Sequence, residues 1–251
     1  MSLYAYPLTR VPRLLALLCL FALGWPLCAA GAETLVLNSA DPAPLSRPGG
    51  TGLNDRIVAE AFHRLGIRVQ LVRLPAERAL QNADQGIDDG TYARIPGLSA
   101  SYPNLVMVPE TIAEFLFTAF AKDQSIQVAD WAGLKPYNVG LITGWKIVEA
   151  NTRDARSVFG VKNEQALFAL LEHGRADVVV LDLYSGKEAI RSMGLVGVRA
   201  LSPPLARRDM HLYLNKRHAD LVPKLDAVLR QMRRDGTIRR LTRDGLGEGG
   251  Q

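Results

Sequence analysis

Short apolar runs alternate with amphipathic segments along the first third of the chain. Residues 35–37 and 68–74 have the pattern of strands, and segment 54–65 between them places its apolar side chains on one helical face. A short helix is expected over 76–84, and a long apolar stretch, 115–121, leads away from this unit. Alternation of this kind predicts an α/β protein with mostly parallel sheets.

A second unit begins near Lys122 and repeats the pattern three times. We expect strands at 137–142, 157–161, 176–182 and 198–201, and helices at 145–151, 164–173 and 184–193. Asn163 has a typical N-cap side chain, and Gly174 is a typical helix stop. The run 176–182 is nearly continuously apolar, which indicates a strand buried on both faces.

The C-terminal segment needs an apolar surface to pack on. After a boundary at Pro203-Pro204 and the charged residues 206–209, it contains a predicted strand, 210–214, and a helix with an apolar face, Leu221, Leu225, Val228, Leu229 and Met232. Because the first unit has too few elements to close alone, we expect the tail to return to it. The prediction is a two-lobed α/β fold with crossings near 115–125 and 202–210. Lobe 1 comprises 33–118 and 207–251, and lobe 2 (119–206) is inserted.

The beginning of the chain has the three parts of a secretory signal peptide. Arg10 and Arg13 form a basic region, residues 14–23 an apolar run, and Ala30-Gly31-Ala32 a cleavage site. The apolar run is short for a membrane helix, which needs roughly 20 residues. We therefore expect residues 1–32 to be a signal peptide that is cleaved, and the product to be exported.

Cleavage would change the composition in two ways. It removes Cys19 and Cys28, the only cysteines, so that no disulfide or thiolate nucleophile remains. The residues before both cysteines are larger than lipoprotein processing requires, so we expect a soluble product. Loss of Arg10 and Arg13 lowers the formal net charge from +5 to +3, a mildly basic value that gives no reason to expect a nucleic-acid partner.

The sequence lacks familiar enzyme motifs. It has neither a Gly-x-Ser-x-Gly elbow nor a Gly-x-x-x-x-Gly-Lys phosphate loop. The four histidines show no metal-ligand spacing. We expect no metal or cofactor and assign no catalytic residue, although a Ser-His-Asp set assembled from distant positions stays open.

A series of short motifs follows in order along the whole chain after residue 32. They are DPAPL (41–45), GLNDRI (52–57), PAERAL (75–80), GIDDG (86–90), GLKPYNVG (133–140), GRAD (174–177) and RDGTI (234–238). With these motifs the chain resembles the extracytoplasmic solute-binding proteins of family 3, the polar amino-acid type of ABC-transporter component. It departs from their Thr-x-x-Arg element, since Arg94 comes sooner after the aspartate, as in a divergent branch.

The resemblance implies both a fold and a function. The implied fold is the type II periplasmic binding-protein fold, and the implied function is capture of a small polar ligand, an amino acid or related carboxylate, between the lobes. The partner would be an inner-membrane ABC permease, the location the periplasm, and the protein a monomer. One alternative is a component that feeds a membrane sensor. Another is an enzyme similar to periplasmic cyclohexadienyl dehydratase, with Glu77 or Asp182 as general acid.

Candidate ligand-binding residues follow the predicted strands, because ligands bind beyond the carboxyl ends of strands in open α/β sheets. They are Asp41 and Pro44 after the first strand, Arg94 after the third, Thr143, Gly144 and Trp145 before a helix, and Asp182 and Tyr184 after the buried run, with Arg78 on the short helix as a weaker candidate.

Each candidate has a structural alternative. Arg94 could hold a carboxylate bidentately or form a salt bridge, and the amides after Gly144 could receive an anion or form a plain turn. Asp182 could accept a ligand ammonium or cap the following helix. Trp145 and Tyr184 could pack on the ligand or in the core, and Arg78 could be solvated. We expect Arg94 and Asp182 to face one ligand from opposite lobes.

Overall fold

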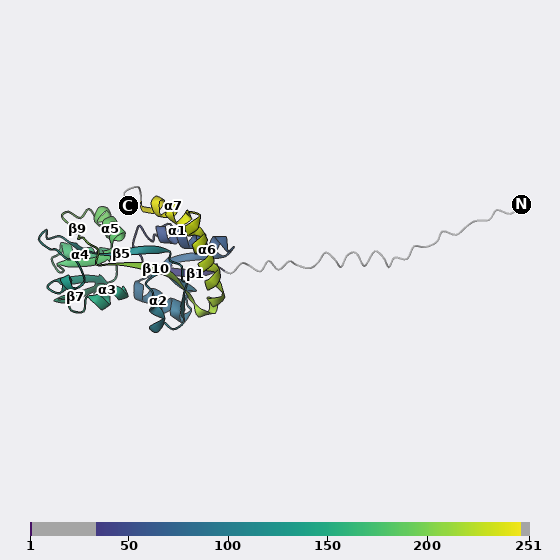
Figure 1. The fold of residues 1–251 in the computed structure, drawn as a ribbon, viewed down its shortest axis with the longest axis horizontal. Coiled ribbons are helices and arrows are strands. Elements are labelled where there is room, and N and C mark those ends of the chain that lie inside the picture. The colour runs from purple at the N-terminus through teal and green to yellow at the C-terminus, as the bar shows by residue number, and fades with distance from the viewer. Residues whose placement is uncertain (2–33, 247–251) are drawn as a thin grey trace. The chain divides into compact units, whose positions relative to one another are not determined.

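The computed structural model describes residues 34–246 together with Met1 (Figure 1). The rest of the expected signal peptide and its cleavage site lie outside the described residues. Within the described part of the chain, no helix is both long and apolar enough to cross a membrane.

The described residues form strands and helices close to the predicted positions. The strands are β1 (Thr34–Ser39), β2 (Arg68–Arg73), β3 (Gly90–Arg94), β4 (Leu105–Met107), β5 (Ala113–Ala121), β6 (Asn138–Ile142), β7 (Ser157–Val161), β8 (Val178–Asp182), β9 (Arg199–Ala200) and β10 (Ala206–Asn215). The α-helices are α1 (Leu53–Arg64), α2 (Ala76–Gln85), α3 (Lys146–Asn151), α4 (Glu164–Glu172), α5 (Leu183–Met193), α6 (Val222–Arg234) and α7 (Thr237–Leu246).

The strands form two sheets that share β10. The first sheet has the order β2-β1-β3-β10, with β4 also paired to β10, and the second has the order β10-β5-β8-β6-β7, with β9 beside β5. We call the residues around the first sheet the first half of the molecule and those around the second sheet the second half. The expectation of mostly parallel sheets was wrong: four pairings are parallel and five are antiparallel. The antiparallel pairs all involve β5 or β10.

Strand β10 joins the two sheets. Its first part, 206–210, pairs antiparallel with β5, and residues 211–215 pair with β3 and β4. The register against β3 shifts between His211 and Tyr213. The charged residues 206–209, which the sequence suggested as a boundary, are therefore the start of this strand. Residues 207–209 are exposed, and β10 is buried only from Met210 onward. The apolar pattern that marks a strand in the sequence therefore begins only at Met210.

The C-terminal helices return to the first half, as expected. Helices α6 and α7 pack against α1 (Figure 1). Arg64 of α1 donates hydrogen bonds to Asp235 at 2.6 Å and to Thr237 Oγ1 at 2.9 Å, at the junction of α6 and α7. The apolar face of α6 is buried at Leu225 and Leu229.

Helix caps and the buried strand of the second half also match the sequence pattern. Asn163 accepts a hydrogen bond from the Ala166 amide at 2.9 Å and so caps α4. Every residue of β8 is buried. Asp182 ends this strand and at the same time caps α5, so one side chain has to serve the transition from strand to helix.

Candidate functional site

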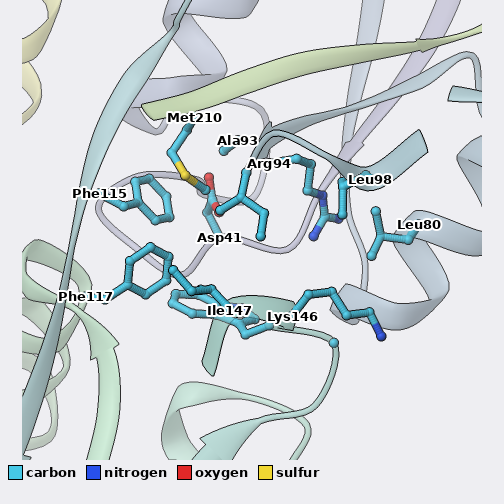
Figure 2. A pocket seen from close by; sticks show the side chains of 13 residues that line it. Asp41, Leu80, Ala93, Arg94, Leu98, Phe115, Phe117, Lys146, Ile147 and Met210 are labelled. Atoms are coloured by element: carbon cyan, nitrogen blue, oxygen red, sulfur yellow. The ribbon is translucent and has the colours of Figure 1, made fainter. Parts of the chain in front are cut away.

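A cavity that is partly open to solvent lies where the two sheets meet (Figure 2). The first half contributes a residue after β1, helix α2, the end of β3 and the loop after β3, and the second half contributes the β6–α3 turn and α3. Strands β5 and β10 contribute the other three side chains. The lining residues are Asp41, Leu80, Ala93, Arg94, Ile95, Leu98, Phe115, Phe117, Gly144, Trp145, Lys146, Ile147 and Met210.

Arg94 supplies buried positive charge to this cavity. It is the last residue of β3, only 8% exposed, and its Nε donates to Thr91 Oγ1 at 2.9 Å. Its Nη2 is buried and has no hydrogen-bond partner among the described residues. Burial lowers the pKa of Arg94, and the charge of Asp41 opposes this shift; a guanidinium nevertheless stays protonated in proteins. An unpaired buried donor of this kind calls for an acceptor, which an anionic ligand would supply.

The backbone before Arg94 has an unusual conformation. Ala93 has a φ of +56°, in the left-handed region that residues with a Cβ rarely adopt. It lies where the pairing of β3 with β10 changes register. Strain of this type is found at ligand sites, where the surrounding structure holds it.

Asp41 supplies buried negative charge. It follows β1, is 4% exposed, and accepts a hydrogen bond from Asn54 Nδ2 at 2.9 Å. Burial raises the pKa of Asp41 to about 7, and the charges of Asp55 and Asp182 add to this effect, whereas Asn54 and Arg94 oppose it. Asp41 therefore changes its charge near neutral pH.

Three aromatic side chains form one wall of the cavity. Phe115 and Phe117 lie on the same face of β5, with ring centroids 6.1 Å apart, because alternate side chains of a strand share a face. Trp145 lies 6.3 Å from Phe115 and 5.9 Å from Phe117, and the contact with Phe117 is edge-to-face at 85°. Aromatic contacts of this geometry stabilise one another beyond their buried area.

Gly144 allows the second half to approach α2 closely. A Cβ at this position would lie 2.5 Å from the Glu77 backbone nitrogen, and its φ is +92°. A side chain is therefore excluded on both counts. The Gly144 amide donates to Glu149 Oε1 at 2.6 Å. The anion at this helix start is thus a carboxylate of the protein itself.

Ion pairs join the two halves beside the cavity. Lys146 Nζ lies 2.6 Å from Glu77 Oε2, and the Tyr102 hydroxyl donates to Glu77 Oε1 at 3.1 Å. The hydrogen bond from Lys146 lowers the pKa of Glu77, so Glu77 is ionised at neutral pH. Further along, Arg73 Nη2 lies 2.8 Å from Glu164 Oε2.

Asp182 has the geometry of a helix cap. It is fully buried and accepts hydrogen bonds from the backbone amides of Leu116 at 3.2 Å, Tyr184 at 3.0 Å and Ser185 at 3.1 Å. Burial raises its pKa to about 6. Asp182 does not line the cavity, so the expectation that it faces a ligand opposite Arg94 is corrected: both of its oxygens are occupied by backbone amides.

The other predicted residues divide into two groups. Asp41, Arg94, Gly144 and Trp145 line the same cavity. Pro44, Arg78, Thr143 and Tyr184 do not line it. Arg78 is exposed on α2, and Thr143 is exposed with its amide bonded to the Val161 carbonyl at 2.9 Å.

The aromatic residues of β5 and the lysine of α3 line the cavity but were not among the predicted site residues. Phe115 and Phe117 fall in a run that is apolar at nearly every position, so no alternation marks the face that lines the cavity. Lys146 directly follows Trp145 at the start of α3, so the predicted helix start was the sequence feature that could have identified it.

Among the described residues, no group of histidine, cysteine and acidic side chains could hold a metal ion.

Comparisons with known proteins identify the fold. No protein-family model matches the sequence. An uncharacterized protein from Shewanella oneidensis is 24% identical over 196 residues, covering 73% of this chain and 72% of that protein. The GluR0 ligand-binding core in complex with L-glutamate is similar in structure, with a TM-score of 0.76 and 14% identity over 86% of this chain and 100% of that one.

Two further solved structures have the same architecture. An ancestral arginine-binding protein bound to arginine has a TM-score of 0.73 and 18% identity, covering 85% of this chain and 98% of that one. A histidine kinase sensor domain with similarity to periplasmic binding proteins has a TM-score of 0.76 and 17% identity, covering 86% and 96%. The chain therefore has the type II periplasmic binding-protein fold, which agrees with the resemblance seen in its sequence.

We predict that replacing Asp182 affects folding more than ligand binding. Asp182→Ala removes an N-cap and leaves three buried amides without their acceptor, so the free energy of unfolding should fall by about 2–4 kcal/mol. Asp182→Asn keeps an acceptor oxygen and should cost less. Urea denaturation measures both variants. A stable Asp182→Ala protein that has lost ligand affinity would identify Asp182 as a ligand-binding residue after all.

A second prediction concerns the pH dependence of stability. Because the pKa of Asp41 is about 7 in the folded protein, against an ordinary value of 3.8, its contribution to stability is fully present below pH 3.8 and is lost as the pH rises to about 7. The loss is at most about 4 kcal/mol. Asp41→Asn should therefore gain stability relative to wild type as the pH increases from 4 to 8. A constant difference between the two proteins over this range would show that Asp41 does not titrate there.

Proposed function

We propose that this protein is a periplasmic solute-binding protein that captures a small ligand, an amino acid or related carboxylate, between its two halves for ABC-type transport. The observation that carries the proposal is the buried Nη2 of Arg94, which has no hydrogen-bond partner in the described part of the chain and belongs to a residue lining a cavity built from both halves. An arginine with free donors is suited to a carboxylate, which it can bind through two parallel hydrogen bonds.

The arrangement of the sheets supports movement of one half against the other. We propose that 33–118 and 207–251 form one lobe and 119–206 the other, with the hinge in β5 and β10. The ion pairs Lys146–Glu77 and Arg73–Glu164 lie across the two halves and would favour the closed form. Hinge closure around a ligand is a common mode of conformational change in two-lobed proteins.

We further propose export to the periplasm, on the basis of the signal-peptide pattern in residues 1–32. A component that feeds a membrane sensor is the second candidate function. The similarity to a histidine kinase sensor domain gives the second possibility specific support. A permease gene beside this one would favour transport, and a histidine kinase or cyclase gene would favour sensing.

The geometry gives less support to a dehydratase. Glu77, one expected general acid, is paired with Lys146, which lowers its pKa. Asp182, the other, is held by backbone amides away from the cavity. A screen that recovers each ligand chemically unchanged after incubation separates binding from catalysis.

Arg94 gives the most direct test of the binding function. A thermal-shift screen of amino acids, small carboxylates, polyamines and sugars should find ligands, because a ligand at ~100 times its Kd adds roughly 2.7 kcal/mol of stability. Arg94→Ala should weaken binding of the tightest carboxylate-bearing ligand roughly 10- to 150-fold, since a charge-assisted hydrogen bond contributes about 1.5–3 kcal/mol.

Two further variants complete this experiment. Arg78→Ala is the matched control, because Arg78 is exposed on the neighbouring α2 and does not line the cavity; its affinity should stay within about twofold of wild type. Arg94→Lys keeps the charge if Arg94→Ala folds poorly, and should still bind more weakly because lysine lacks the bidentate geometry. Unchanged affinity in both Arg94 variants would reject the carboxylate site.

A further inference from the structure

Apolar side chains dominate the lining of the cavity. Nine of its thirteen lining residues are apolar, and they surround the space from both halves: Leu80, Ala93, Ile95, Leu98, Phe115, Phe117, Trp145, Ile147 and Met210. The remaining four are Asp41, Arg94, Gly144 and Lys146. A ligand enclosed here would place most of its surface against hydrocarbon and aromatic rings.

The two buried charges of the lining come from neighbouring parallel strands. Asp41 follows β1 and Arg94 ends β3, and β1 and β3 pair directly. Both side chains are less than one-tenth exposed, and both line the same cavity (Figure 2). A buried carboxylate and a buried guanidinium in the lining of one apolar cavity match a small zwitterion, with the ligand's carboxylate at Arg94 and its ammonium at Asp41.

The lining offers little to a polar side chain of a ligand. Lys146 is paired with Glu77 at 2.6 Å and lies 3.4 Å from Glu149, and its amino group points away from Phe115 and Phe117 in Figure 2. The carboxylate of Asp182 is bonded to backbone amides. A glutamine, glutamate or arginine side chain in this cavity would lose its hydration without equivalent partners, which is unfavourable.

We infer that the preferred ligand is an α-amino acid with an apolar side chain, aromatic or branched, rather than a polar one. Asp41 and Arg94 hold its ammonium and carboxylate, and Phe115, Phe117 and Trp145 enclose its side chain. The inference rests on the proposed function, and it names the chemical class that this cavity selects.

Isothermal titration calorimetry of the wild-type protein tests the class of ligand. The probes are L-phenylalanine and L-leucine against L-glutamine, L-glutamate and L-arginine. We expect the better apolar amino acid to bind at least tenfold more tightly than each polar one. Tighter binding of a polar amino acid would overturn this inference and leave the proposed function standing. Absence of binding by all five, and by the wider screen, would overturn both.

Two analogues test the roles of the buried charges. 3-Phenylpropanoate lacks the ammonium of phenylalanine and 2-phenylethylamine lacks the carboxylate, and each should bind at least tenfold more weakly than L-phenylalanine. If 3-phenylpropanoate binds equally well, Asp41 does not recognise an ammonium and the zwitterion assignment is wrong.

Variants at the aromatic wall test the enclosure of the side chain. Phe117→Ala should weaken L-phenylalanine or L-leucine about tenfold or more but change the affinity for L-alanine by less than threefold. Phe117→Leu preserves most of the buried volume, so it provides the same comparison if Phe117→Ala is too unstable. Equal losses for large and small ligands in both variants would show that Phe117 supports the fold rather than the ligand.

Discussion

Pairing of β10 with strands of both sheets determines where the candidate site lies. Residues 206–210 hydrogen-bond to β5 and residues 211–215 to β3 and β4, so one backbone segment spans the junction of the sheets. Met210, which lines the cavity, is the last residue before the change of partner. β3 ends and β5 begins beside the point where β10 changes its pairing partner. A charged residue, Arg94, and an aromatic one, Phe115, therefore line the same cavity. The cavity is thus a consequence of how the two sheets are joined.

The junction is costly in electrostatic terms. Asp41, Arg94 and Asp182 are all buried near it, and burial disfavours the charged form of each. Asp182 is compensated by three backbone amides, whereas Arg94 keeps a buried nitrogen that no described residue pairs with. A core selected for stability alone would avoid such an arrangement, because buried unpaired polar groups cost free energy. The buried Arg94 nitrogen is accounted for if a ligand supplies its hydrogen-bond acceptor.

Much of the architecture could be read from periodicity, because helices such as α1 and α6 bury one apolar face. The prediction was less successful where tertiary structure decides. The direction of β5 and β10 depends on the joining of the sheets, and local sequence does not encode it. Asp182 shows the same limit at a single residue: an aspartate after a buried strand suits both a ligand and a helix cap, and only the position of the Leu116 amide distinguishes them. Phe115 and Phe117 were not predicted as site residues because phenylalanine occurs both in cavity walls and in the core, so the residue type does not distinguish the two environments.

The central claim is that a ligand binds at Arg94 against the aromatic wall. A crystal structure of the protein with L-phenylalanine, or with the tightest ligand of the screen, tests it most directly. We expect a carboxylate within hydrogen-bond distance of Arg94 Nη2 and a side chain in contact with Phe115, Phe117 and Trp145. A ligand bound elsewhere, with Arg94 Nη2 still unpaired, would contradict it.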